Sequence, residues 1–79
     1  MESKPTARQL IKAAVAAAGG QTNIGITQGI RPQAVGHWIR TGRVPTERII
    51  PLCEAGANVV NPTQILEAMT REAGEKVAA

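Results

Sequence analysis

Apolar residues along the chain recur at intervals of three and four positions, the spacing that places them on one face of an α-helix. The first such stretch covers residues 7–18. Thr6 and Gln9 have the spacing of a capping box at its start, and Gly19 and Gly20 follow its end, where we expect one glycine to form a left-handed cap. No stretch alternates apolar and polar residues as a strand does, so the pattern predicts an all-α fold.

Four more segments continue the helical pattern, separated by short connections. They are residues 21–28, 32–41, 50–55 and 62–73. Together they predict a compact four- to five-helix domain over residues 6–73, with a flexible amino terminus at 1–5 and a flexible tail at 74–79. A chain of 79 residues with 43% hydrophobic content can build one small core but has no room for a second domain.

Threonine and proline mark the starts of these segments. Thr22 is the expected N-cap of the second helix, and Pro32 stands at the first position of the third. Thr46 is the expected cap of the fourth, but Pro51 would remove a backbone hydrogen bond inside that helix. We therefore expect the first turn of the fourth helix to be loose and 3₁₀-like. Residues 61–64 repeat the capping-box pattern before the fifth.

The inner faces of these helices predict the core. The expected core residues are Leu10, Ile11, Ala14, Val15, Ala18, Ile24, Ile30, Val35, Trp38, Ile39, Ile49, Leu52, Cys53, Ile65, Leu66 and Met69. Trp38 is the one aromatic residue of the chain, so the rest of the core must be built from aliphatic side chains. Cys53 is expected to behave as a small buried hydrophobe.

Residues 21–40 predict two short helices that cross at a tight turn. Gly25 allows the helices to approach closely, and Gly29 can adopt the positive φ that such a turn requires. This arrangement is a helix-turn-helix. In its DNA-binding version, the second helix enters the major groove and reads base edges. Side chains that read bases are therefore expected on the second helix of this pair.

The outer side of that helix carries side chains suited to base edges. Arg31 can bond guanine and Gln33 adenine in bidentate fashion. Ala34 can touch a thymine methyl group, and His37 can donate to a base acceptor or a phosphate. Gly36 would let the backbone approach DNA closely. The expected base-reading residues are Arg31, Gln33, Ala34 and His37.

Phosphate contacts are expected at the two ends of the same unit. Gln21 and Thr22 begin the preceding helix, where free backbone amides favour an anion. Arg40, Thr41 and Arg43 lie toward the carboxyl end of the second helix, where a DNA strand backbone passes.

The charge of the chain is divided between its halves. Residues 1–48 hold seven basic and two acidic residues, whereas residues 49–79 hold two basic and four acidic residues. The basic half is the one that contains the helix-turn-helix. This asymmetry fits a polyanionic partner on the amino-terminal side of the molecule.

Other functions find little support in the residues. The chain has one histidine, one cysteine and no aspartate, so it offers neither paired carboxylates nor a nucleophile and base, and too few ligands for zinc. We expect no enzymatic activity, no small-molecule substrate and no cofactor. No apolar run is long enough to span a bilayer, and the single Cys53 fits a reducing cytoplasm.

Residues 19–45 resemble the Cro/YdaS-like branch of phage and prophage helix-turn-helix regulators. The resemblance rests on Ala17–Gln21, on Gly29–Val35, on Trp38 and on Arg40–Pro45. It implies a lambda-repressor-like fold and a dimer that represses a promoter through a palindromic operator in double-stranded DNA. It also implies that Gln21 contacts phosphate, that Arg31, Gln33 and His37 face bases, and that Arg40 and Arg43 support the strand backbone.

Three positions depart from the family pattern. Gln28 stands where a hydrophobic residue is usual before the turn glycine, so its helix is expected to pack differently. Ile26 is apolar where the family exposes a residue, and could face a neighbouring chain. Gly25 replaces the more usual alanine, a change that we expect to be harmless.

Two functions from different classes follow. The first is a sequence-specific transcriptional regulator, a Cro-like repressor that binds DNA as a homodimer in the bacterial cytoplasm. The alternative is a prophage protein-interaction module, of the toxin–antitoxin or another partner-binding kind, with little specific DNA binding. The basic amino-terminal half favours the first, and the exposed Ile26 leaves the second open.

Overall fold

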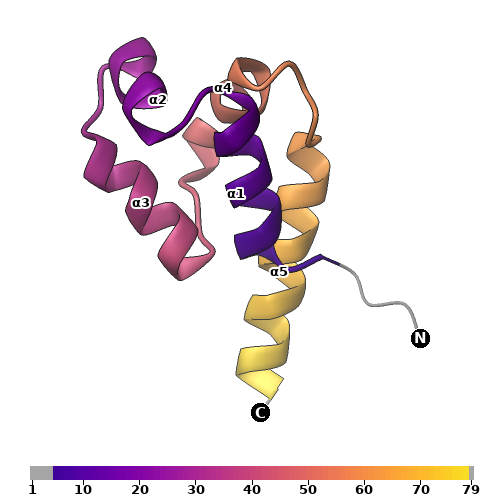
Figure 1. The fold of residues 1–79 in the computed structure, drawn as a ribbon. Helices are drawn as coiled ribbons and strands as arrows, with labels where there is room; N and C mark the ends of the chain where they lie inside the picture. The colour runs from indigo at the N-terminus through magenta and orange to yellow at the C-terminus, as the bar shows by residue number, and fades with distance from the viewer. Residues whose placement is uncertain (1–4, 79) are drawn as a thin grey trace.

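The computed structural model describes residues 5–78, which form five α-helices (Figure 1). They are α1 (Ala7–Ala17), α2 (Gln21–Gln28), α3 (Pro32–Thr41), α4 (Thr46–Ala55) and α5 (Pro62–Ala78). Figure 1 shows α1 between the α2–α3 pair and α5. No strand occurs in the described residues, so the predicted all-α fold is confirmed. None of these helices is both long and apolar enough to cross a membrane.

The core is built around α1, which contacts each of the other four helices. The largest fully buried side chains come from all five helices and are Ile11, Ile24, Val35, Leu52, Cys53 and Ile65. Trp38 is 5% exposed, and Ala14 and Ala18 let neighbouring helices come close to α1. Burial of one large aliphatic side chain contributes about 1.5–3 kcal/mol to the free energy of folding. A core of this size therefore suffices for a small domain.

Both ends of α1 form as its flanking residues predict. The Thr6 hydroxyl accepts from the Gln9 backbone amide at 3.2 Å, and the Gln9 side chain accepts from the Thr6 amide at 2.9 Å. At the other end, the Gly20 amide donates to the Val15 carbonyl at 2.9 Å, the six-to-one bond of a Schellman motif. Gly19 has φ 96° in this motif, a value that favours glycine.

The predicted caps of α2 and α4 are wrong. Gly20, with φ 100° and ψ 173°, is the N-cap of α2, so Thr22 lies within the first turn of the helix. The reason is that the Schellman motif at the end of α1 leads the chain directly into α2. The N-cap of α4 is Pro45 and not Thr46.

The helix α4 is continuous from Thr46 to Ala55 with Pro51 inside it, so the loose opening turn expected from this proline is absent. Proline at this position removes one backbone donor, but its fixed φ is compatible with helical geometry. Ile49, Leu52 and Cys53 are buried on the inner face of α4, as predicted. Their packing holds the helix in place despite the missing bond.

The helix α5 differs from its prediction in length and in orientation. It continues to Ala78, so residues 74–78 are helical where a loose tail was expected. Leu66, predicted to face inward, is 47% exposed, whereas Ile65 and Ala68 are buried. The small Ala68 lets α5 lie close to its neighbours. Of the predicted flexible ends, residues 1–4 and 79 lie outside the described residues.

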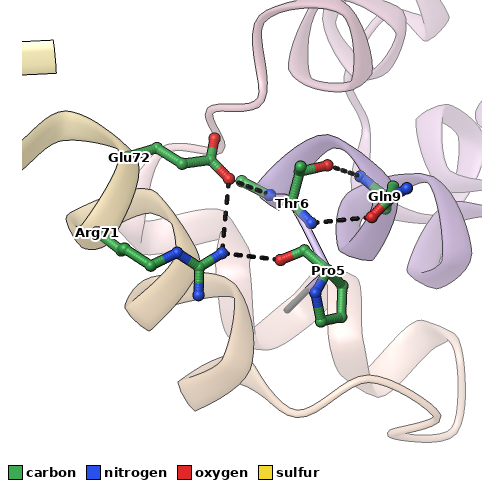
Figure 2. A network of polar contacts seen from close by, with 6 residues as sticks. Pro5, Thr6, Gln9, Arg71 and Glu72 are labelled. Carbon is green, nitrogen blue, oxygen red and sulfur yellow. Dashed lines mark hydrogen bonds and ion pairs between the residues drawn. The ribbon is translucent and has the colours of Figure 1, made fainter. Parts of the chain in front are cut away.

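Polar contacts join the start of α1 to α5 (Figure 2). The Ala7 amide donates to a Glu72 carboxylate oxygen at 2.7 Å, and Arg71 donates to the Pro5 carbonyl at 2.9 Å. Arg71 and Glu72 also form an ion pair of 3.9 Å. The carboxylate thus lies at the positive end of the α1 dipole, a stabilising position. We call Pro5, Ala7, Arg71 and Glu72 the terminal clamp.

Candidate nucleic-acid interface

The turn between α2 and α3 is tight because two glycines allow it. Gly29 ends α2 in the left-handed conformation, with φ 68° and ψ 33°. The Ile30 amide then donates to the Gly25 carbonyl at 2.9 Å. A Cβ atom on Gly25 would lie 2.7 Å from the Ile30 carbonyl oxygen and 3.3 Å from the Pro32 ring. Glycine in place of the more usual alanine therefore fits this turn, because the turn backbone fills the space that a Cβ would occupy.

The helix α3 separates a buried side from an exposed one. Val35 and Trp38 are buried against the core, and Pro32 occupies the first helical position as predicted. Gln33, His37 and Arg40 recur at intervals of four and three residues and are all exposed, so they share the opposite side of the helix. We call these three residues the α3 stripe. The helix presents hydrogen-bonding side chains to solvent while its buried side fixes its orientation.

Two side chains of the α3 stripe contact each other. Arg40 Nη2 lies 3.5 Å from His37 Nδ1. The backbone carbonyl of His37 accepts a hydrogen bond of 2.8 Å from the Thr41 hydroxyl. Thr41, predicted to contact phosphate, is exposed, but it would have to give up this bond in order to donate to a phosphate oxygen.

Arg31 and Ala34 extend the stripe toward the turn. Arg31 is the N-cap of α3 and its side chain is exposed. Ala34 is half-buried, so only part of its surface is accessible for contact with a base. Together with Gln33 and His37, the four predicted base-reading residues occupy the first two turns of α3 and its cap.

The start of α2 lies beside α3. Gln21 and Thr22 are exposed in the first turn of α2. The Gln21 amide oxygen lies 3.1 Å from the position of a Cβ on Gly36. Gly36 therefore makes room for Gln21, whereas the sequence predicted that it would bring backbone close to DNA. The two helices place Gln21 next to the α3 stripe.

Cationic residues surround the carboxyl end of α3. Arg43 is exposed in the connector to α4 and lines a shallow groove with His37 and Thr46. Other residues lining this groove are Trp38, Thr41, Val44, Pro45 and Met69. Two of the predicted phosphate-contacting residues, Thr41 and Arg43, thus line one groove.

Sequence reasoning missed two cations on α1. Arg8 and Lys12 are both exposed, and neither was predicted to contact DNA. They line a groove that also includes Ile39 of α3 and Glu72 of α5. The Arg8 side chain packs over the α3 cap, because a Cβ on Gly42 would lie 2.9 Å from Arg8 Cγ. Their spacing of four residues is visible in the sequence, but their place beside α3 depends on the packing of α1.

Gln28 and Ile26, both expected to be unusual for a helix-turn-helix, lie in contrasting surroundings on α2. The amide nitrogen and oxygen of Gln28 are both buried and have no hydrogen-bond partner among the described residues. A buried, unpaired amide is unfavourable by about 1–3 kcal/mol. Ile26, on the same helix, is 76% exposed.

The histidine, arginines and glutamines described above make up the candidate interface. Comparison of this chain with protein-family models, curated proteins and solved structures found no match.

Proposed function

We propose that this protein binds double-stranded DNA in a sequence-specific manner, with α3 in the major groove. The α3 stripe carries the proposal: Gln33, His37 and Arg40 are exposed on one side of a helix whose other side is buried. An α-helix fits the major groove, where each base pair presents a distinct pattern of donors and acceptors. Gln33 and Arg31 are side chains that bond adenine and guanine in bidentate fashion.

Flanking residues support the same orientation. Gln21 lies on one side of α3, and Arg40 and Arg43 lie at its carboxyl end. These are positions at which a strand backbone runs past a helix in the groove. Phosphate contacts provide most of the affinity and fix the register of the protein on DNA.

We further propose that the protein is a Cro-like transcriptional repressor of phage or prophage origin, which acts in the cytoplasm of a bacterial host. The motif resemblance of residues 19–45 supports this role. As a homodimer on a palindromic operator, it would place two copies of α3 in successive major grooves about 34 Å apart.

A binding selection from a random duplex library tests the proposal. The recovered duplex should bind more tightly than a scrambled duplex of the same composition. Gln33→Ala should then lose about 1–3 kcal/mol of binding free energy through one base position of the recovered duplex. Arg43→Ala should weaken binding to both duplexes alike. Thr70→Ala, at an exposed position of α5, serves as a control and should leave the affinities for both duplexes unchanged. Recovery of no preferred duplex would refute sequence-specific binding.

A second candidate, a partner-binding module, is favoured by exposed apolar side chains. Ile26, Ile50 and Val59 are 76%, 56% and 68% exposed. Exposed apolar side chains mark a protein interface where they form one patch. This alternative predicts that the purified chain binds no duplex in a salt-dependent way, and that Ile26→Ser abolishes binding to its protein partner without altering the stability of the fold.

A further inference from the structure

Two cations of α1, Arg8 and Lys12, line a groove beside α3. They are four residues apart, about one turn of the helix, and both are exposed. The other residues that line this groove are Thr6, Gln9, Ile39 and Glu72. Because Ile39 belongs to α3, the cations of α1 border the helix that carries the exposed hydrogen-bonding side chains.

Arg8 is held at the carboxyl end of α3. Gly42, the C-cap of α3, has φ 72°, and a Cβ on it would lie 2.9 Å from Arg8 Cγ and 3.7 Å from Arg8 Cδ. The aliphatic stem of Arg8 therefore lies over this cap, in space that glycine leaves open. Since the stem is already held, less conformational entropy remains to be lost when the guanidinium group binds an anion.

The one carboxylate among the described residues of this groove is engaged by other groups. It belongs to Glu72, which accepts from the Ala7 amide at 2.7 Å and pairs with Arg71 at 3.9 Å. Residues 5–46, which include α1 and α3, contain five basic residues and no acidic one. This surface therefore attracts a polyanion along α1 as well as along α3.

The two grooves beside α3 lie on opposite flanks of this helix. One contains Ile39, and the other contains His37, Thr41 and Arg43. Ile39 is two residues from His37 and two from Thr41, and two residues turn an α-helix by about 200°. Each flank thus carries basic side chains. A helix in the major groove has the backbone of one DNA strand on each of its flanks.

We propose that Arg8 and Lys12 bind phosphates of one DNA strand while Arg43 binds phosphates of the other; this inference rests on the proposed DNA binding. The helix α1 then belongs to the interface, and cations on both flanks centre α3 in the groove. Such contacts add affinity for any duplex and fix the position from which α3 reads bases.

Neutralisation of single phosphates tests this assignment. The probes are copies of the selected duplex, each with one uncharged methylphosphonate, placed in turn along both strands. At a phosphate that a cation contacts, this change should weaken binding of the unmodified protein about two- to fivefold, as for an exposed ion pair. In Arg8→Met and in Lys12→Gln, some of these phosphates should no longer affect affinity. Within a half-site they should lie on the strand opposite to those that lose their effect in Arg43→Gln.

Two further measurements separate charge from packing. Arg8→Met keeps an aliphatic stem over Gly42 and removes the charge, whereas Arg8→Lys keeps the charge and should remain sensitive to the same phosphates as the unmodified protein. Lys12→Gln leaves the contact between Arg8 and Gly42 in place, so it tests this flank of α3 even if Arg8→Met unfolds. Circular dichroism verifies that each variant is folded.

The proposed function and the role of α1 fail in different ways. If Arg8→Met and Lys12→Gln stay sensitive at every phosphate that matters to the unmodified protein, α1 does not contact DNA, and the proposed function is unaffected. The strand assignment is wrong if Arg8→Met and Arg43→Gln lose sensitivity on the same strand of a half-site. Recovery of no preferred duplex would overturn the proposed function and the role of α1 together.

Discussion

At the scale of single residues, the surroundings of a residue decide how its substitution changes the stability of the fold, more than the residue type does. Gly25 and Gly74 are both helical glycines, but only Gly25 lies against the backbone of a neighbouring segment. Gln28 and Gln33 lie on adjacent helices of the same motif, but only Gln28 has its amide group buried.

Gly25→Ala should destabilise the fold although alanine is the better helix former. The added Cβ would lie 2.7 Å from the Ile30 carbonyl oxygen, so the turn must open. Overpacking of this kind is unfavourable by about 1–3 kcal/mol, which equals or exceeds the propensity gain of about 1 kcal/mol. Gly74→Ala meets open space and should be neutral or stabilising. Urea unfolding measures both, and a more stable Gly25→Ala variant would contradict the tight turn.

Gln28→Leu should stabilise the protein by about 1–3 kcal/mol, because it removes the unpaired amide from its buried site. The same substitution at the exposed Gln33 should change the free energy of unfolding by no more than about 0.5 kcal/mol. Thermal unfolding of the two variants makes the comparison. Equal effects at both positions would mean that the Gln28 amide is solvated.

Burial raises the pKa of the Cys53 thiol, since the thiolate is disfavoured away from water. The side chain is 1% exposed. A chromogenic disulfide reagent should therefore react with the folded protein far more slowly than with the protein in denaturing urea. Rapid reaction under native conditions would show that α4 opens readily.

At the scale of the helix, the bounds of two elements differ from what their sequences predict. Pro51 predicts an irregular start for α4, yet packing keeps that helix continuous. A loose tail was expected from residue 74 onward, yet residues 74–78 are the last turns of α5. The terminal clamp joins this helix to the start of α1 over a separation of 65 residues between Ala7 and Glu72.

Glu72→Gln tests the terminal clamp. The amide can still accept from the Ala7 amide, but the charge at the start of α1 and the ion pair with Arg71 are lost. Because both side chains are 34% exposed, we expect a loss of only about 0.3–1 kcal/mol. Glu67→Gln, at an exposed position of the same helix, is the matched control and should have no measurable effect. Equal stability of the two variants would show that the clamp charge contributes nothing.

At the scale of the whole molecule, the fold concentrates cations around α3. Arg8 and Lys12 of α1 border the same helix end as Arg40 and Arg43, although they are distant in sequence. A polyanion that contacts α3 would therefore meet charge from α1 as well.

This arrangement predicts the salt dependence of DNA binding. Arg8→Gln should weaken binding to selected and scrambled duplexes alike and reduce the slope of log affinity against log salt by about 0.9, as for the loss of one phosphate contact. Lys76→Gln, in the acidic carboxyl-terminal half, is the charge-matched control and should leave the slope unchanged. An unchanged slope for Arg8→Gln would confine the interface to α2, α3 and the connector.

The sequence by itself was enough to predict the helical spacing of apolar residues, the glycines and prolines at helix ends, and the outer side of α3. These features depend on local backbone chemistry. Tertiary structure alone decided that Gly25 excludes a methyl group, that Ala68 and not Leu66 faces inward, and that Arg8 lies beside Gly42. The contact between His37 and Arg40 also required side-chain positions. These features depend on which segments the core brings together, and a distance between segments is not encoded in the periodicity of either one.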